Sequence, residues 1–484
     1  MSPLLAFRIE LPPAGSRRRL RALYEQLRAA ILDGRLRPGL RLPSSRVLAQ
    51  SHGLARATVV ATYDRLLAEG YLASRAGSGT YVADGLPARA RPRATIATSD
   101  ARIAPHWRDA REVAADEPPP IDFRVGLPER AGFPLDLWRR LLGRALRLSG
   151  RAGLDVPRTA GRAALCAAIA THVSFTRAVA CQAEDVVVTA GAQQAFDLIA
   201  RVLVTAGRTR VAVEEPGYPP LRAALAAAGA RIVAVPVDDE GLVVERIPRD
   251  VRAIFVTPSH QFPLGVTMSL ERRTALLELA RARGAAIVED DYDSEFRYGP
   301  RPLEALQTLD RADSVLYVGT FSKTLSPSLR TGFIVAPAWA RAALTAAKRD
   351  AGDTNPAVIQ DALALMIDGG HLARHVRRMQ RRYEARRARL LAGLATLLPE
   401  LAPVASSAGL HVTAWLPQRI DPERLVARAG AEGVGMRSLA PYFASGRGRP
   451  GLVLGYGDIA DSQVDEGLKR LKTALDAARP GRPR

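Results

Sequence analysis

The first hydrophobic pattern of the chain has the spacing of a helix. Leucine, isoleucine and tyrosine recur every three or four positions over residues 20–32, and a glycine and a proline-glycine pair then end the predicted helix. A second helix is expected to begin at the cap Pro43-Ser44-Ser45, and a third is expected over 57–69. Residues 70–82 predict a small hairpin with a glycine-rich tip. We therefore expect one compact domain over residues 1–83.

Periodicity is lost between about residues 84 and 120, where prolines stand among alanine, arginine and aspartate. This composition predicts a semi-stiff linker. After it, short β-branched runs alternate with helical stretches, which is typical of a mainly parallel sheet covered on both faces. The expected strands are 185–189, 210–213, 232–235, 253–257, 286–289, 315–318 and 332–335.

The alternation predicts a large α/β domain over residues 121–344. Beyond it, arginine-rich helical stretches and two further strands, near 410–416 and 452–456, predict a smaller C-terminal α/β domain over 345–484. The chain carries no apolar run long enough to span a bilayer, and Cys166 and Cys181 form neither a disulfide framework nor a metal-ligand pattern. These features favour a cytoplasmic protein without contact to a membrane.

Net charge points to an acidic partner, but only weakly. The formal charge of +20 rests almost wholly on arginine, so a compositional bias explains it as well as a function does. The local excess is more informative, because residues 1–85 hold 13 Arg against 6 Asp and Glu. Double-stranded DNA is the partner that fits a small basic helical domain.

The order of elements in the first domain predicts a helix–turn–helix. Residues 45–52 supply the supporting helix, Gly53-Leu54 the turn, and residues from 56 onward the helix that enters the major groove. The hairpin would form a wing in the minor groove. The candidate DNA-contacting residues are Arg46, Arg56 and Thr58 around the turn and Arg75, Gly77 and Gly79 in the wing.

This domain resembles the GntR family of bacterial repressors. One departure is Ala55, where the family more often has serine. The residues that carry the resemblance are Leu23-Tyr24-Glu25-Gln26-Leu27, Gly34-Arg35-Leu36-Arg37-Pro38-Gly39, Arg41-Leu42-Pro43-Ser44-Ser45-Arg46, Thr58-Val59, Glu69-Gly70-Tyr71-Leu72 and Gly77-Ser78-Gly79-Thr80-Tyr81-Val82.

Chemistry-bearing residues follow several strands of the large domain. A lysine can lose its proton and form an imine, and the chain has only four lysines. One of them, Lys323, comes shortly after the predicted strand 315–318, and Thr320 and Ser322 stand just before it. The strand over 286–289 leads into Asp290 and Tyr292. Because ligands bind at the carboxyl ends of strands in open α/β sheets, we expect these side chains to share a site.

The set fits pyridoxal 5'-phosphate (PLP), which needs an imine lysine, a carboxylate at its ring nitrogen, a donor to its ring hydroxyl, a stacking ring and an anion cradle. Tyr218 after the strand over 210–213 can stack on the cofactor. The phosphate would be held by Ser322 and Thr320, by Arg330, and by the strand-to-helix turn Gly191-Ala192-Gln193.

These segments resemble the fold-type I aminotransferases, and more closely the MocR/PdxR-like regulators, which join a GntR domain to that fold. The resemblance implies that Lys323 forms the PLP imine, Asp290 pairs with the pyridine nitrogen and Tyr292 donates to the ring hydroxyl. It also implies homodimers in which the DNA domain packs on the partner's large domain. The matching segments are Thr257-Pro258-Ser259-His260-Gln261-Phe262-Pro263-Leu264-Gly265, Val288-Glu289-Asp290-Asp291-Tyr292-Asp293-Ser294-Glu295-Phe296-Arg297 and Tyr317-Val318-Gly319-Thr320-Phe321-Ser322-Lys323-Thr324-Leu325.

Two departures concern the substrate. Aminotransferases have an asparagine where this chain has Phe262, and they place an arginine for the substrate carboxylate in a strand that here, over 452–456, contains none. Arg437 is the candidate substitute for an effector carboxylate. No metal site is expected, since His371 and His375, four apart on a helix, are interpreted as a solvated face.

Three functions remain open from the sequence. The first is a PLP-sensing transcription regulator that controls vitamin B6 synthesis or salvage genes. In the second, PLP is permanently bound and the protein senses an amino compound such as an ω-amino acid. The third is a working aminotransferase with an inherited DNA-binding domain.

Overall fold

The computed structural model describes residues 9–13, 16, 18–75, 78–84, 102–108, 118–149, 158–299, 303–352, 355–446 and 448–478. The chain divides into two compact units, Met1–Glu112 and Val113–Arg484. Each unit has its own hydrophobic core. None of the helices described is long and apolar enough to cross a membrane.

The first unit is a winged helix–turn–helix, as the sequence predicts. Its buried core includes Leu23, Leu27, Leu48, Val59 and Leu66, which come from all three helices. The two strands of the wing pair antiparallel. The elements are α1 (Arg19–Leu32), α2 (Ser45–Ser51), α3 (Arg56–Ala68), β1 (Leu72–Arg75) and β2 (Gly79–Val82).

The two helices of the DNA-reading motif begin differently. At α2, the Ser44 hydroxyl accepts a hydrogen bond from the Val47 amide at 3.3 Å, which is a regular N-cap. At α3, the N-cap residue is Ala55, which has no side chain that can accept. The departure seen at position 55 therefore leaves the amino end of α3 without a side-chain cap.

The second unit is built on an eight-stranded sheet of order β4-β11-β10-β9-β8-β5-β6-β7. The neighbours β10, β9, β8, β5 and β6 are parallel, whereas β11 runs antiparallel to both β10 and β4. All seven strands expected from the sequence are present. Their bounds are β4 (Val186–Thr189), β5 (Arg210–Glu215), β6 (Arg231–Asp238), β7 (Gly241–Leu242), β8 (Val251–Val256), β9 (Ala286–Asp291), β10 (Val315–Thr320) and β11 (Gly332–Val335).

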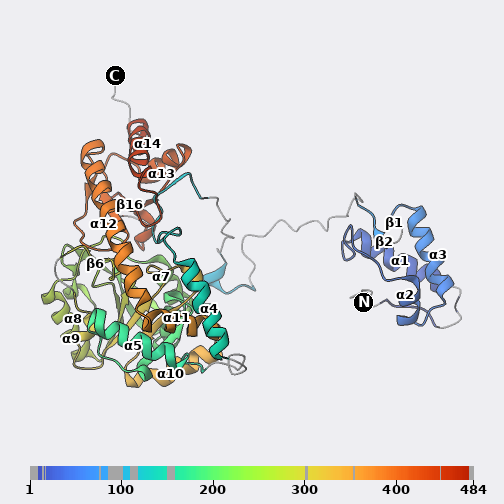
Figure 1. Cartoon of the computed structure of the whole chain (residues 1–484), viewed down its shortest axis with the longest axis horizontal. Helices are drawn as coiled ribbons and strands as arrows, with labels where there is room; N and C mark the ends of the chain where they lie inside the picture. Colours follow the sequence, from blue (N-terminus) through green and yellow to red (C-terminus); the bar gives the residue numbers. More distant parts are fainter. Residues whose placement is uncertain are drawn as a thin grey trace. The chain divides into compact units, whose positions relative to one another are not determined.

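Helices cover both faces of this sheet (Figure 1). One face packs against α6 (Ala192–Leu203), α7 (Pro219–Ala227) and α10 (Ala338–Asp350). The other face packs against α5 (Ala163–Arg177) and α11 (Ala357–Asp368), with α4 (Leu135–Ser149) outside them, and against α8 (Leu270–Arg283). This is the fold-type I aminotransferase architecture.

A four-stranded antiparallel sheet forms a further core near the C-terminus. Its order is β12-β13-β16-β15, and β3 pairs in parallel with β14 beside it, so that Ile121 and Phe123 belong to this core. The elements are β3 (Ile121–Asp122), β12 (Ala402–Pro403), β13 (His411–Trp415), β14 (Val434–Gly435), β15 (Arg437–Ser438), β16 (Gly451–Gly455), α12 (His371–Leu397), α13 (Pro422–Ala431) and α14 (Gln463–Ala478).

The uncapped start of α3 gives a stability prediction. Ala55→Ser supplies the missing acceptor, so we expect the first unit to gain about 1 kcal/mol of unfolding free energy. Hydrogen exchange of α3 amides in the full chain measures the gain. Ser44→Ala is the matched opposite, because it removes the cap of α2 and should cost a similar amount. Equal exchange in wild type and Ala55→Ser would contradict the capping explanation.

Candidate functional site

The carboxyl ends of five strands meet at one edge of the large sheet. The strands β10, β9, β8 and β5 are mutually parallel, and β4 runs in the same direction because β11 is antiparallel to both β4 and β10. The predicted cofactor residues lie at these ends or in the segments that follow them. The sheet therefore brings to one edge residues that are more than 100 positions apart in the sequence.

Lys323 follows β10 and is enclosed by the segment after β3. Its Nζ donates a hydrogen bond to the carbonyl oxygen of Gly126 at 2.8 Å. A Cβ at Gly126 would lie 2.9 Å from Nζ, so a side chain here would crowd the amine. Burial lowers the pKa of Lys323 below its ordinary value, although the carboxylates of Asp293 and Asp290 oppose the shift. A lowered pKa favours the neutral amine that forms an imine.

The adjacent carboxylates Asp290 and Asp291 have opposite environments. Asp291 accepts a hydrogen bond from Nε of Arg177 at 2.7 Å and another from the Tyr317 hydroxyl at 2.7 Å. Burial alone would raise the pKa of Asp291, but Arg177 and these hydrogen bonds bring it below its ordinary value. For Asp290, the described residues provide no such partner.

The Oδ1 atom of Asp290 is buried and has no hydrogen-bond partner among the described residues. Burial, together with the neighbouring carboxylates Asp291, Asp293 and Glu214, raises the pKa of Asp290 well above its ordinary range. A buried carboxylate oxygen without a partner is costly. It is the feature expected where a cationic group of a ligand is to be received, such as a protonated pyridine nitrogen.

Aromatic rings surround this carboxylate. Tyr218, at the start of α7, lines a cavity with Asp290, and burial, then Asp290, raises the pKa of Tyr218 to about 12. Phe262 lies at the centre of the cluster. Its ring centroid is 5.5 Å from that of Tyr218, 5.8 Å from Tyr292, 5.3 Å from His411 and 5.3 Å from Tyr442.

The predicted anion cradle lies where β4 turns into α6. Gly191 has a φ of 89°, and the space beside its α-carbon faces the guanidinium of Arg330 at 3.9 Å. Asn355 links the two segments, since its Nδ2 donates to the carbonyl oxygens of Thr189 at 3.1 Å and Arg330 at 3.2 Å. Arg330 itself is exposed, so its guanidinium is accessible to a phosphate.

The remaining cradle residues are placed as follows. The hydroxyl of Thr320 donates to that of Ser322 at 3.0 Å, directly before Lys323. Ala192 and Gln193 form the first turn of α6, where backbone N–H groups are available to an anion. The side chain of Gln193 instead donates to the carbonyl oxygen of Pro220 at 3.0 Å. Only the backbone of Gln193 is therefore directed toward a phosphate.

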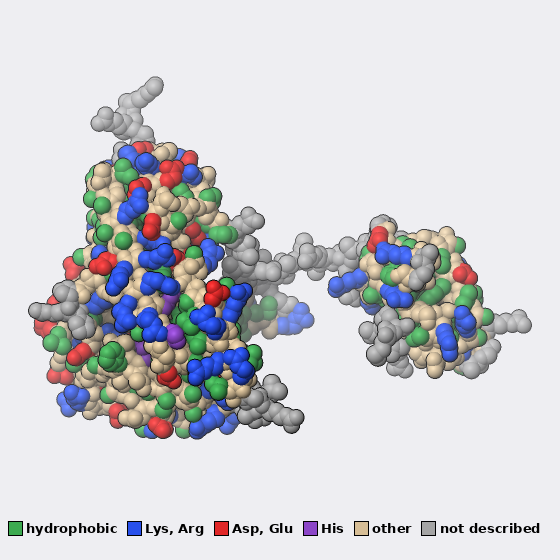
Figure 2. Space-filling model, viewed as in Figure 1, with side chains coloured by type: hydrophobic (Ala, Val, Ile, Leu, Met, Phe, Trp, Pro, Cys, Tyr) green, Lys and Arg blue, Asp and Glu red, His purple; other side chains and the backbone are tan. Residues whose placement is uncertain are grey.

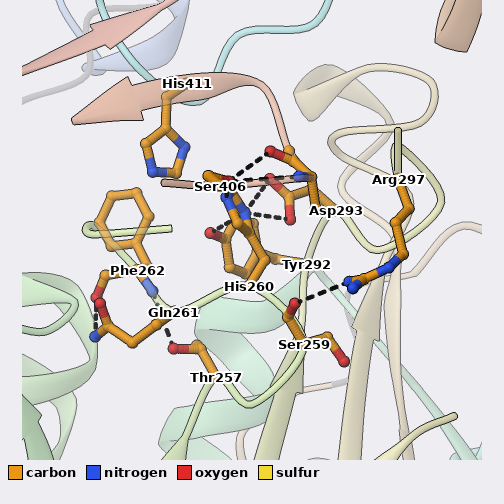
Figure 3. A network of polar contacts seen from close by, with 12 residues as sticks. Thr257, Ser259, His260, Gln261, Phe262, Tyr292, Asp293, Arg297, Ser406 and His411 are labelled. Carbon is orange, nitrogen blue, oxygen red and sulfur yellow. Dashed lines mark hydrogen bonds and ion pairs between the residues drawn. The ribbon is translucent and has the colours of Figure 1, made fainter. Parts of the chain in front are cut away.

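A buried polar network lies next to Tyr292, and sequence reasoning assigned no role to it (Figure 3). Nδ1 of His260 is 2.9 Å from the Tyr292 hydroxyl and 3.0 Å from Oδ1 of Asp293, and its Nε2 is 3.2 Å from the Ser406 hydroxyl. His260 and Asp293 stand inside the segments that carry the family resemblance. Their participation could be found only once the fold had brought the two segments together.

Arg437 lies apart from the lysine, on β15 of the second sheet. Its side chain is exposed, and it acts electrostatically on Tyr442, whose ring packs against Phe262. Strand β16, where aminotransferases would carry the substrate arginine, is Gly-Leu-Val-Leu-Gly and is wholly buried. Arg437 is thus an exposed cation close to the aromatic cluster.

The histidines considered for a metal are placed differently from the expectation. His371 contacts Arg374 on the surface, but His375 is buried, and this burial, then Arg378, lowers its pKa to about 4. The expectation of a solvated face is wrong for His375. Among the described residues, His260, Asp293 and His411 have metal-ligand spacing. Both ring nitrogens of His260 and Nε2 of His411 already bond to protein atoms.

The predicted DNA-contacting residues of the helix–turn–helix lie together. Arg46 and Arg56 are exposed, and Nε of Arg56 is 3.5 Å from the Ser45 hydroxyl, so the amino ends of α2 and α3 are adjacent. Thr58 is half-buried in the first turn of α3. Their common position is that of a reading-helix amino end.

The wing residues are partly engaged within the protein. Arg75 ends β1, pairs with Asp84 at 3.6 Å and covers the Tyr81 ring at 4.6 Å. Gly79 begins β2 with a φ of 116°, and Gly77 lies outside the described residues. Arginines are not confined to this unit, since they also gather over α12 and α4 of the larger unit (Figure 2). The motif, rather than charge alone, therefore locates the DNA-reading surface.

Comparisons with known proteins agree with both units. Residues 20–82 match the bacterial regulatory proteins of the gntR family, and residues 128–442 match aminotransferase class I and II. The chain is similar to the probable rhizopine catabolism regulatory protein MocR of Rhizobium meliloti, with 39% identity over 94% of this chain and 93% of MocR. It is also 33% identical to the pyridoxine biosynthesis transcriptional regulator PdxR of Corynebacterium glutamicum, over 94% of this chain and 95% of PdxR.

Solved structures similar to this chain are aminotransferases. The kynurenine aminotransferase of Pyrococcus horikoshii, in complex with PMP, is 27% identical with a TM-score of 0.71, over 78% of this chain and 97% of the enzyme. The α-aminoadipate aminotransferase LysN of Thermus thermophilus, bound to a phosphopyridoxyl-leucine, is 31% identical with a TM-score of 0.69, over 74% of this chain and 92% of the enzyme. The cofactor that this fold points to is pyridoxal phosphate. The enclosed Lys323 and the Oδ1 atom of Asp290, which lacks a partner among the described residues, fit it.

The extent of these matches establishes the type of protein. The regulators match nearly the whole chain, and the solved enzymes match only its larger unit. The chain belongs to the MocR/PdxR-like transcription regulators, in which a DNA-binding GntR domain is joined to a PLP-binding aminotransferase-like domain.

Proposed function

We propose that PLP bound at Lys323 is the signal of this regulator, and that its binding changes the affinity of the winged helix–turn–helix for operator DNA. The observation that carries the proposal is the buried Oδ1 atom of Asp290, which has no hydrogen-bond partner in the described part of the chain, beside an enclosed lysine amine. PLP supplies an aldehyde that forms an imine with a lysine and a pyridine nitrogen that is protonated against a carboxylate. Both complementary groups are present at one edge of the sheet.

Each residue has a separate task in this proposal. Lys323 provides the amine, Asp290 faces the ring nitrogen, and Tyr292 donates to the ring hydroxyl oxygen. Tyr218 provides the ring that stacks on the cofactor. The phosphate is bound by Ser322, Thr320, Arg330 and the backbone of Gly191, Ala192 and Gln193, because an arginine and a helix amino end both stabilise an anion.

The regulated genes are proposed to be those of vitamin B6 synthesis or salvage. The relative named for regulating pyridoxine biosynthesis supports this assignment, since it matches the chain over nearly its whole length. The active form is proposed to be a cytoplasmic homodimer, in which the DNA domain of one subunit packs on the large domain of the other. The two half-sites of an operator would then be read by one dimer.

A second candidate effector is an amino compound with a carboxylate, such as an ω-amino acid, acting on permanently bound PLP. Exposed Arg437, beside the aromatic cluster, favours it as a carboxylate partner. Titration with amino donors separates the functions. Loss of PLP absorbance without a keto product supports this effector, whereas turnover supports a working aminotransferase, against which the absence of arginine from β16 argues.

Replacing Lys323 tests the signal. In Lys323→Ala we expect no borohydride-trapped adduct and no PLP-dependent change in binding to the upstream DNA of the gene, because the aldehyde has no amine to bind. DNA binding without PLP should persist. Lys472→Ala, which changes an exposed lysine of α14, is the control. An unchanged response to PLP in Lys323→Ala would reject covalent sensing.

Replacing Asp290 tests the cofactor orientation. Asp290→Asn should weaken PLP binding at least tenfold, since a charge-assisted hydrogen bond contributes about 1.5–3 kcal/mol. In the cofactor-free protein, by contrast, the ionised carboxylate of Asp290 destabilises the folded state. Because burial raises the pKa of Asp290, the folded state holds a proton that the unfolded state releases, so stability falls as pH rises above about 4.

The asparagine variant lacks this contribution. Unfolding of the cofactor-free variant should therefore depend less on pH between about 4 and neutrality than unfolding of the wild type. Urea denaturation at several pH values measures the difference. If Asp290→Asn bound PLP as tightly as the wild type, or lost stability with rising pH in parallel with the wild type, the proposed role of Asp290 would be wrong.

Replacing Arg56 tests DNA reading. Arg56→Ala should weaken operator binding, and if Arg56 contacts phosphate the slope of log K against log salt should fall by about 1. Arg21→Ala is the matched control, because Arg21 is an exposed arginine of α1 that pairs with Glu25. Titrations of a labelled operator at several salt concentrations give both slopes. Equal effects of the two substitutions would refute a specific contact by Arg56.

A further inference from the structure

His260 presents one ring nitrogen to two polar neighbours. Nδ1 lies 3.0 Å from Oδ1 and 3.2 Å from Oδ2 of Asp293, and 2.9 Å from the hydroxyl oxygen of Tyr292. His260 and Asp293 are each 2% exposed, so water does not compete for these contacts. Figure 3 shows His260 between the two side chains. The hydrogens in this cluster can therefore be assigned from the chemistry of its three groups.

An ionised carboxylate only accepts hydrogen bonds, whereas a ring nitrogen carries at most one proton. With Asp293 ionised, the proton on Nδ1 is directed at the carboxylate. Nδ1 then has no free electron pair, and the Tyr292 hydroxyl cannot donate to it. The Tyr292 oxygen can accept a share of that N–H, while its own proton remains available.

The other side of the imidazole is compatible with this assignment. Nε2 lies 3.2 Å from the hydroxyl of Ser406, which also lies 3.2 Å from the carbonyl oxygen of Ala408. The Ser406 hydroxyl has one proton, which it can donate either to the Ala408 carbonyl or to Nε2, so it accommodates Nε2 with or without a hydrogen. Asp293 is consequently the group that determines which way the hydrogen on Nδ1 points.

The Tyr292 hydroxyl has no second partner among the described residues. Burial, followed by the carboxylates Asp293 and Asp290, raises the pKa of Tyr292 well above its ordinary value, so the hydroxyl keeps its proton throughout the physiological range. An enclosed donor without an acceptor is the arrangement expected beside an acceptor on a ligand.

We propose that His260 and Asp293 are positioning residues that hold the Tyr292 hydroxyl so that its proton is donated to the ring hydroxyl oxygen of bound PLP. This inference rests on the PLP site proposed above. It concerns the chain's own hydrogen-bond chain Asp293–His260–Tyr292, in which no bond other than hydrogen bonds forms or breaks. It also explains why the asparagine of aminotransferases is dispensable here, since Phe262 at that position cannot donate.

The pH at which bound PLP loses its proton reports this donor. A hydrogen bond to the ring oxygen favours the deprotonated chromophore, so removing the donor raises the midpoint of the absorbance change with pH. Other titratable groups facing the cluster are Asp290 and Asp291 of β9, Glu214 of β5, Lys323 after β10 and His411 of β13. They are the same in all variants compared below except the control His411→Gln.

The experiment is a pH titration of the visible absorbance of the PLP-loaded full chain. Tyr292→Phe, His260→Leu and Asp293→Asn should each raise the midpoint by about one unit. The asparagine at 293 keeps the shape of the aspartate, but its amide can donate to Nδ1 and reverse the hydrogen. Adding His260→Leu to Tyr292→Phe should raise the midpoint no further, because both act through one hydroxyl.

Two further variants separate positioning from packing. His260→Asn keeps an N–H near Nδ1 and should restore most of the wild-type midpoint. His411→Gln is the matched control, because the His411 ring is also buried, lies 4.9 Å from that of His260, and bonds to the carbonyl of Pro263 rather than to Tyr292. Its midpoint should equal that of the wild type.

The outcomes are distinct. A lower PLP affinity or stability of His260→Leu with an unchanged midpoint would overturn the proposal and leave His260 a packing residue. A shift that adds to that of Tyr292→Phe would also overturn it. A wild type without the PLP absorbance would reject the PLP site itself, and this proposal with it.

Discussion

The site depends on how two neighbouring buried carboxylates on β9 are stabilised. Successive side chains of a strand point to opposite faces, so Asp290 and Asp291 enter separate buried environments. On one face Arg177 neutralises Asp291 at 2.7 Å. On the other face no cation of the described chain bonds to Oδ1 of Asp290. The protein provides the counter-charge of Asp291, whereas the counter-charge of Asp290 is left to a ligand.

This asymmetry organises the elements around it. Different strand ends carry Lys323, Tyr218 and the turn at Gly191. Each can contact a cofactor bound at Asp290 only because the sheet brings these strand ends close together. The aromatic cluster around Phe262 gives the site an apolar wall, and electrostatic interactions are stronger in less polar surroundings. In an aminotransferase a polar side chain stands at position 262. Here we propose Tyr292 as the donor to the ring oxygen, with its orientation set by His260.

The fold was largely predictable from the sequence, because the sheet strands are β-branched runs and the winged motif has characteristic turns. All seven strands expected for the large domain formed. The site was predictable only where a family motif names the residue. Asp293 and His260 are 33 positions apart, and Gly126 lies 197 positions from Lys323, so no local pattern could reveal their contacts. The burial of His375 was missed because helical spacing does not say which face is covered.

The difference between the environments of Asp290 and Asp291 favours reversible binding of the ligand. With its pKa raised by burial, Asp290 can take up a proton when no cofactor is present, which limits the cost of leaving it unpaired. The remaining network, from Arg177 to Asp291 and from Asp293 to His260, is closed by protein groups alone. The cofactor-free fold is thus expected to persist, and a sensor needs such a state. If PLP then alters DNA affinity by some factor, DNA must alter PLP affinity by the same factor, so operator occupancy itself tunes the response to the vitamin.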